Sequence, residues 1–145
     1  MLLNIPAILG PDLLWSLAAM GHGDEIVIAD ANFPGQSTGQ RCHRLDGVSA
    51  SAALEAILRI FPLDTFVAEP ATVMQVVGNP DATPPAVADF RSILDAANGG
   101  PVGIARIDRF AFYDRARAAF AVVQTGETRL YGNVILTKGV IAPQA

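Results

Sequence analysis

The chain has 145 residues, 51% hydrophobic and 17% charged, which is enough for one domain with a buried core over residues 1–145. Its net charge of −4 argues against nucleic-acid binding, and no apolar stretch predicts a signal sequence or a membrane span. Cys42, the single cysteine, cannot form an intrachain disulfide, which favours a cytoplasmic location.

The first third of the chain predicts a helix followed by two strands. Pro11 suits the first turn of a helix with one apolar face, and Gly21 can end that helix. The β-branched residues 25–30 predict a buried strand, residues 35–39 a loop, and residues 41–45 a short strand.

The middle of the chain predicts two further helices around a strand. Ser49 or Ser51 can cap a helix that Pro62 stops, and residues 72–77 predict an apolar strand. Residues 78–85 predict a proline-rich loop that leads into the next helix. The inward positions of that helix would be Val87, Phe90, Ile93, Leu94 and Ala97.

The last third predicts a strand, a short helix and a hairpin. The strand covers residues 102–107, Asp108 can cap the helix, and residues 120–124 and 131–137 resemble a hairpin around "TGETR". Alternating helices and buried strands predict an α/β fold, a single three-layer α/β/α domain with a mixed sheet. We expect parallel pairing early and antiparallel pairing at the end.

Asp30 and His22 are the first candidate site residues. Asp30 ends a predicted strand, and ligands of open α/β sheets bind beyond the carboxyl ends of strands. His22 stands between Gly21 and Gly23, which permit close approach of a ligand, and histidine transfers protons near neutral pH. The alternatives are a strand-end turn for Asp30 and a solvated turn after a helix for His22.

Three further candidate site residues, like Asp30 and His22, also have simple structural explanations. Arg109 could be an exposed arginine at a helix start, or it could hold a polar ligand. Tyr131 and Asn133 alternate to one face of the predicted last strand, where Tyr131 could serve only in packing.

Common catalytic motifs do not explain the sequence. The "GQSTG" segment at residues 35–39 matches the pattern of a hydrolase nucleophile elbow, but it lacks the preceding strand, the long following helix and a suitable later histidine. No glycine-rich phosphate-binding motif is present, and His22, Cys42 and His43 do not have the spacing of a metal site. We therefore expect neither a metal nor a cofactor.

Four segments together resemble the fucose mutarotase and ribose pyranase family, in particular its L-fucose branch. They are "MGHGDEIVIADANFP" at 20–34, "RFAFYDRA" at 109–116, "TGE" at 125–127 and "YGNVILTKGVI" at 131–141, with weaker agreement over nearly the whole chain, including "LDTF" at 63–66. The resemblance implies an isomerase that interconverts the α and β anomers of L-fucose or a related monosaccharide.

The resemblance also implies residue roles. His22 would be the acid/base catalyst and Asp30 a sugar-binding carboxylate. Arg109 falls where fucose-type members carry arginine and ribose-type members histidine. The remaining sugar contacts would come from Tyr131, Gly132 and Asn133. Asn32 departs from the histidine of some fucose-type members, which leaves the sugar's identity open. D-ribose pyranase activity and a non-catalytic, monosaccharide-binding role in sugar uptake are the alternatives.

One geometric point concerns the distance between His22 and Asp30. A strand rises about 3.3 Å per residue, so eight extended steps would separate the two residues by more than about 20 Å. Either the glycines fold His22 back along the strand, or a neighbouring subunit completes the site. The resemblance implies a ring-like homo-oligomer, decameric in bacterial members, and we expect a subunit interface near the sugar pocket.

Overall fold

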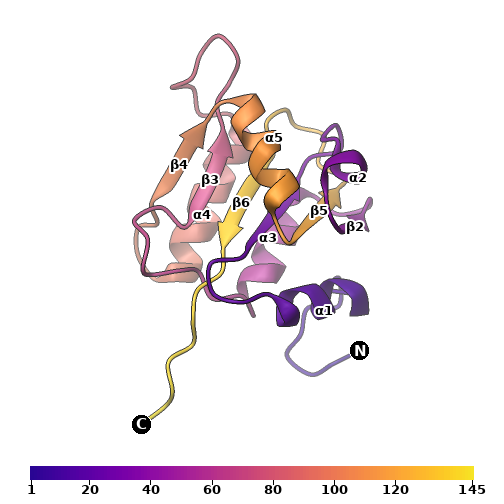
Figure 1. Cartoon of the computed structure of the whole chain (residues 1–145), viewed down its shortest axis with the longest axis vertical. Helices are drawn as coiled ribbons and strands as arrows, with labels where there is room; N and C mark the ends of the chain where they lie inside the picture. The colour runs from indigo at the N-terminus through magenta and orange to yellow at the C-terminus, as the bar shows by residue number, and fades with distance from the viewer.

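One six-stranded sheet organises the protein, in the order β2-β5-β1-β6-β3-β4 (Figure 1). The computed structural model describes all residues from 1 to 145. The strands are β1 (Glu25–Ala29), β2 (Cys42–Leu45), β3 (Ala71–Met74), β4 (Ile104–Ile107), β5 (Ala121–Thr125) and β6 (Val134–Thr137). β6 runs antiparallel to both of its neighbours, β1 and β3, whereas all other pairs are parallel.

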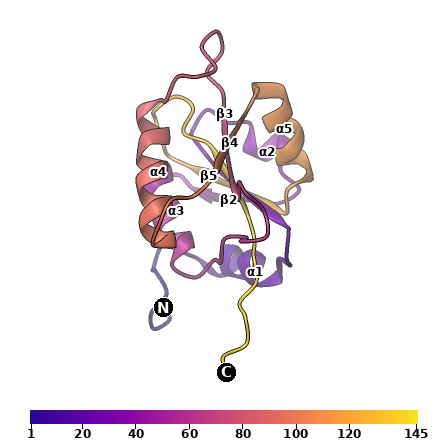
Figure 2. The same ribbon diagram turned by 90° about the vertical axis from the view of Figure 1, so that its left-hand side faces the viewer.

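Helices cover both faces of this sheet, as Figure 2 shows. They are α1 (Pro11–Ala19), α2 (Gly35–Thr38), α3 (Ala50–Leu58), α4 (Pro85–Asn98) and α5 (Arg109–Ala118). Ile26 and Ile28 of β1 pack into the core under α3 and α4, while Val27 and Ala29 pack on the opposite side with Phe112 of α5. This alternation confirms the predicted three-layer α/β/α fold with a mixed sheet.

The helix starts follow from local chemistry. The Ser49 hydroxyl accepts a hydrogen bond from the Ala52 N–H at 3.1 Å, so Ser49 rather than Ser51 caps α3. The Asp108 carboxylate accepts from the N–H groups of Phe110 and Ala111, each at 3.0 Å, and caps α5 as predicted. The second cap fixes the start of α5, where Arg109 lies.

The predicted C-terminal hairpin is wrong. β5 and β6 are not paired, because β1 lies between them and bonds to both. Every residue of β5 is buried, and such strands are stable in the interior of a sheet that is covered on both faces, rather than in an isolated hairpin. Tyr131 and Asn133 consequently precede β6 in a loop and do not lie on it.

Smaller differences concern element boundaries. Residues 35–38 form the short helix α2 instead of a loop, and β3 and β4 are each shorter than predicted. No helix of the protein has the length and apolar character that crossing a membrane requires.

Phe112 should be a main determinant of stability, since its ring is fully buried between α5 and the sheet. Phe112→Ala should lower the free energy of unfolding by about 3–5 kcal/mol, because it leaves a cavity. Phe112→Leu keeps most of the volume and should cost only about 1 kcal/mol. Urea unfolding followed by circular dichroism measures both; equal losses would contradict the packing described here.

Candidate active site

Asp30 and Asn133 form a buried pair where β1 ends and β6 begins. The Asn133 side-chain oxygen accepts from the backbone N–H of Asp30 at 2.8 Å, and the Asn133 amide donates to Asp30 Oδ2 at 3.1 Å. Asp30 Oδ1 accepts from the N–H of Asn32 at 3.0 Å. The two residues are 103 positions apart in sequence, and the antiparallel course of β6 brings them together.

A cavity of about 200 Å³ opens beside this pair. Its lining combines polar and apolar side chains: Asp30, Asn32, Phe33, Met74, Val77, Arg109, Tyr113, Leu130, Tyr131 and Asn133. Pockets for drug-sized molecules are commonly about 300–1,000 Å³, so this cavity suits a smaller ligand. Carboxylate, amide and guanidinium groups together supply acceptors and donors for a ligand rich in hydroxyl groups.

Arg109 and Tyr113 enter the cavity from the first turns of α5. Arg109 Nε donates to the Tyr113 hydroxyl at 3.0 Å, and the guanidinium lies 5.4 Å from the centre of the Tyr113 ring. No carboxylate forms an ion pair with Arg109, in contrast to Arg115 and Arg129. The guanidinium therefore keeps donors for a ligand.

Tyr131 lines the cavity in an unusual backbone conformation, and Gly132 follows it in close packing. Tyr131 has a φ of 59°, a left-handed value that is rare for a bulky residue and occurs most often at functional sites. Its hydroxyl accepts from the N–H of Val77 at 3.1 Å and so fixes the loop after β3. A side chain at Gly132 would come within 2.7 Å of Glu127 Cγ, so the close packing at this position requires glycine.

Burial perturbs the protonation of Asp30. Loss of solvent raises the pKa of its carboxyl group, and the hydrogen bonds from Asn32 and Asn133 oppose this shift. The side chain is 4% exposed, yet it faces a cavity. A buried carboxylate with a perturbed pKa beside a cavity is typical of a functional site.

His22 lies at the other end of the sheet, in the turn before β1. Gly23 in this turn has a φ of 86°, which glycine adopts readily. His22 Nε2 is 3.1 Å from Asp64 Oδ1, and its ring centre is 5.3 Å from that of Phe66. The His22 side chain is 45% exposed, whereas that of Asp64 is 4% exposed.

The buried partner of His22 is held in its ionised form. Asp64 Oδ1 also accepts from the N–H of Phe66 at 3.0 Å, and this bond, followed by the contact with His22, lowers the pKa of the Asp64 carboxyl group. A carboxylate can only accept, so Nε2 of His22 must donate to it. The second ring nitrogen, Nδ1, is then the atom that can exchange protons with a ligand.

The structure thus brings together five of the six predicted site residues and separates the sixth. Asp30, Arg109, Tyr131 and Asn133 line the cavity, with Gly132 between the last two. His22 and Asp30 flank the five residues of β1, which at about 3.3 Å per residue extend about 17 Å. The glycines therefore do not fold His22 back to Asp30 within one chain.

Sequence reasoning missed Asp64, Tyr113 and Met74 as parts of these two sites. The "LDTF" segment signalled Asp64 only as a point of resemblance, and Tyr113 lies one helical turn after Arg109, a spacing that could have indicated a shared face. Met74 reads in the sequence as a core strand residue.

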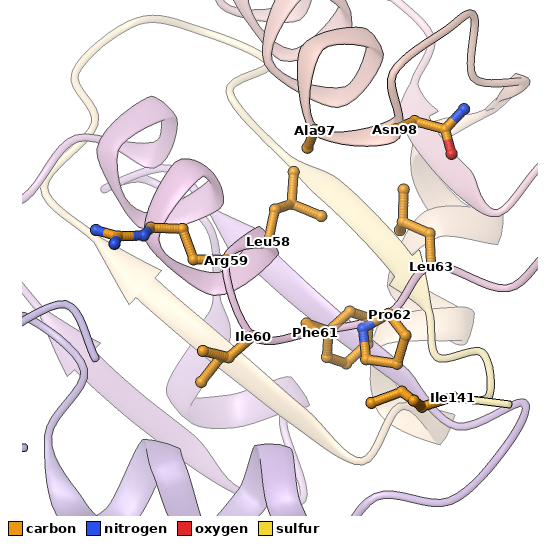
Figure 3. Close-up of a pocket in the computed structure, with 9 residues that line it drawn as sticks. All are labelled: Leu58, Arg59, Ile60, Phe61, Pro62, Leu63, Ala97, Asn98 and Ile141. Atoms are coloured by element: carbon orange, nitrogen blue, oxygen red, sulfur yellow. The ribbon is translucent and has the colours of Figure 1, made fainter. Parts of the chain in front are cut away.

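A larger cavity is chemically unsuited to proton transfer. It measures about 580 Å³ and lies near the ends of α3 and α4, lined mainly by apolar residues such as Leu58, Phe61 and Leu63 (Figure 3). Arg59 is its one titratable side chain, and its guanidinium points away from Leu63 (Figure 3). The Asp30 cavity is smaller but has the functional groups.

The fold and site define an α/β protein with a small polar pocket at the carboxyl end of β1 and a separate histidine–aspartate pair. The sequence model of the RbsD / FucU transport protein family matches residues 3–141. The chain belongs to this family.

Individual relatives agree with this assignment. The fucose mutarotase of Homo sapiens is 50% identical, and the match covers 96% of this chain and 94% of that protein. The crystal structure of the fucose mutarotase from Streptococcus pneumoniae in complex with L-fucose has a TM-score of 0.91 and 42% identity, covering 97% and 100% of the two chains. It has the same fold as the protein described here.

A more distant relative shares the fold alone. The structure of Bacillus subtilis RbsD complexed with D-ribose has a TM-score of 0.73 at 21% identity, with 98% of this chain and 100% of that chain covered.

The two site carboxyl groups should titrate in opposite directions from an ordinary aspartate. Burial raises the pKa of Asp30, so it should take up a proton first as the pH falls, whereas the lowered pKa of Asp64 should keep it ionised longest. Asp64 ionisation should therefore stabilise the fold above its unfolded pKa, and this contribution should be lost as the pH falls through its folded pKa. The raised pKa of Asp30 has the opposite effect: protonated Asp30 stabilises the fold at low pH, and this contribution is lost as the pH rises through its folded pKa. Carbon-detected NMR of both carboxyl groups measures the order; coinciding midpoints would contradict it.

Proposed function

We propose that this protein is a sugar mutarotase that interconverts the α and β anomers of L-fucose by general acid–base ring opening. The observation that carries the proposal is the buried Asp30–Asn133 pair facing a small cavity that also receives the unpaired guanidinium of Arg109. The curated relatives at 42–50% identity, which are named fucose mutarotase or L-fucose mutarotase, support the same reaction.

The cavity supports a 6-deoxy sugar. Asp30 accepts hydrogen bonds from sugar hydroxyls, Arg109 donates to them, and Asn133 belongs to the same polar wall. Met74, Val77 and Leu130 give the cavity an apolar side. L-fucose carries a methyl group where other hexoses carry a hydroxymethyl group, and this methyl group suits the apolar side.

The reaction requires a proton to leave the anomeric hydroxyl and another to reach the ring oxygen. The hemiacetal then opens, the aldehyde turns its other face, and the ring closes as the opposite anomer. Nδ1 of His22 can serve in both directions, because histidine exchanges protons readily near neutral pH. Asp64 keeps the ring oriented through Nε2. Residues 1–145 would carry out these steps as one domain, with the cytoplasm as the expected compartment.

The alternatives differ in specific ways. D-ribose pyranase activity would use the same proton transfer but reclose the ring on another hydroxyl; Arg109 and the apolar side of the cavity favour fucose. A non-catalytic role in sugar uptake would need the cavity but not His22. The exposed histidine held by the buried Asp64 favours catalysis.

Replacing His22 should abolish catalysis without abolishing sugar binding. We expect His22→Ala to lower the rate of L-fucose anomer exchange by about 10²- to 10⁴-fold, the usual contribution of a positioned acid–base group. Asp64→Asn should cause a smaller loss, because it removes the charge but retains an acceptor. Saturation-transfer NMR on L-fucose, D-ribose and D-galactose measures the rates and ranks the sugars.

The second histidine of the chain supplies the control. His43 bonds to Ser16 at 2.7 Å, away from both sites, and His43→Gln should leave anomer exchange unchanged. Undiminished exchange in His22→Ala would favour the binding role, and faster ribose ring exchange than fucose exchange in the wild type would favour the pyranase.

We further propose that a neighbouring subunit brings His22 to the Asp30 cavity. His22 lies beside the exposed Phe66, which is followed in the chain by the exposed Val67. The exposed Val77, Phe110 and Leu130 lie at the cavity or next to Arg109. Two apolar surfaces at opposite ends of one sheet can meet when copies associate head to tail, and such contacts form a ring where the rotation between copies closes. A homo-oligomer, with the decamer as the expected form, would place each histidine beside a partner's cavity.

Mixed subunits test this arrangement directly. His22→Ala and Asp30→Ala should each be inactive alone, since every site lacks one group. Random 1:1 co-assembly should restore about a quarter of wild-type activity, because about one site in four receives both intact groups. Co-expression with two affinity tags isolates the mixed oligomer. No recovery in a mixed oligomer of confirmed composition, or full activity of a monomer in sedimentation, would overturn the shared site.

A further inference from the structure

Gln124 of β5 holds both ends of the loop that carries Asp30. Its side-chain amide donates to the backbone oxygen of Asp30 and accepts from the backbone N–H of Gly35, the latter at 3.1 Å. The side chain is 3% exposed, and both bonds are buried. Gln124 lies beside Ala29 in the parallel register of β1 and β5, so its amide extends the pairing just beyond the end of β1.

The loop between these two anchors supplies three residues of the cavity, Asp30, Asn32 and Phe33. Its other backbone–backbone contacts are three: the Ala31 N–H donates to the Glu127 oxygen at 2.8 Å, the Phe33 N–H to the Asp30 oxygen at 3.1 Å, and the Gly35 N–H to the Phe33 oxygen at 2.8 Å. One planar amide with a donor and an acceptor therefore bonds both ends of the loop to β5.

Gly35 makes this contact possible. A Cβ atom there would overlap Gln124 Oε1 and would lie 3.1 Å from Val122 Cγ1. Gly35 does not have a positive φ, so its backbone angles do not demand glycine; the close approach of the amide does. This explains the first glycine of the "GQSTG" segment, which resembles a hydrolase motif in the sequence.

We propose that Gln124 and Gly35 are positioning residues for sugar binding, acting through the loop that presents Asp30. The inference rests on the proposed mutarotase function. Without the amide, the Asp30 oxygen and the Gly35 N–H each lose one of two buried partners and keep only their bonds to the Phe33 backbone, so the loop is no longer held to β5 in the geometry that the sugar requires. The His22–Asp64 pair lies at the other end of the sheet and keeps its own contacts, so proton transfer to bound sugar continues.

The expected signature is a change in KM without a matching change in kcat. Gln124→Leu should raise KM for L-fucose about tenfold and change kcat by less than about threefold, as measured by saturation-transfer NMR over a range of sugar concentrations. Gln36→Leu is the matched control: Gln36 adjoins Gly35 but is exposed, and its variant should keep the wild-type KM.

A double-mutant cycle tests the contact between the two residues. Gly35→Ala should raise KM by displacing the amide, and Gln124→Ala should raise it by removing the amide. The double variant should resemble Gln124→Ala alone, because the added methyl group then meets no amide. If the two single-variant increases in KM multiply in the double variant, the two positions act independently, and this result would overturn the coupling.

A second variant covers the case in which Gln124→Leu does not fold. Gln124→Glu keeps the volume and can still accept from Gly35, but its carboxylate cannot donate to the Asp30 oxygen, so KM should again rise. An unchanged KM in this variant would overturn the positioning role, whether or not kcat and thermal stability fall. Failure of the proposed function is distinguishable, because the wild-type protein itself would then show no anomer exchange.

Discussion

The reciprocal hydrogen bonds between Asp30 and Asn133 depend on the direction of one strand. If β6 ran parallel to β1, its first residues would lie at the opposite end of the sheet and Asn133 could not reach Asp30. Because β6 is antiparallel, the loop before it meets the carboxyl end of β1. The cavity therefore forms where the carboxyl ends of β1 and β3 adjoin the start of the single reversed strand, a variation on the usual ligand position in α/β sheets.

The same sheet separates the Asp30–Asn133 pair from the His22–Asp64 pair. The Asp30–Asn133 pair, proposed to bind sugar hydroxyls, lies at one end of β1, and the His22–Asp64 pair lies at the other. A single chain holds each half in a rigid environment: Asn133 fixes Asp30, and Asp64 fixes His22. In the proposed mechanism the two groups act on one small sugar when copies of the chain assemble head to tail, so the length of β1 makes oligomerisation part of that mechanism and not merely a source of stability.

Local patterns in the sequence predicted much of the fold. The caps at Ser49 and Asp108, the apolar helix faces and the strand at β1 follow from short-range chemistry, and the three-layer class follows from their alternation. The hairpin prediction was wrong because adjacency in sequence says nothing about a third strand inserting between two others. That insertion depends on contacts between residues far apart in sequence, in strands that are apolar on both faces.

The site was predictable to the extent that each residue carried its own signal. The strand-end position of Asp30 was visible, whereas the pairing of His22 with Asp64 spans 42 residues and needed coordinates. Gln124 and Gly35 show the same limit: neither a glutamine in an apolar strand nor a glycine in a polar loop indicates a function alone. Their roles arise from a close contact across 89 residues, in which the missing Cβ of one makes room for the amide of the other. Buried polar contacts of this kind cost stability unless every partner is present, so they persist where the geometry of a binding loop must be unique.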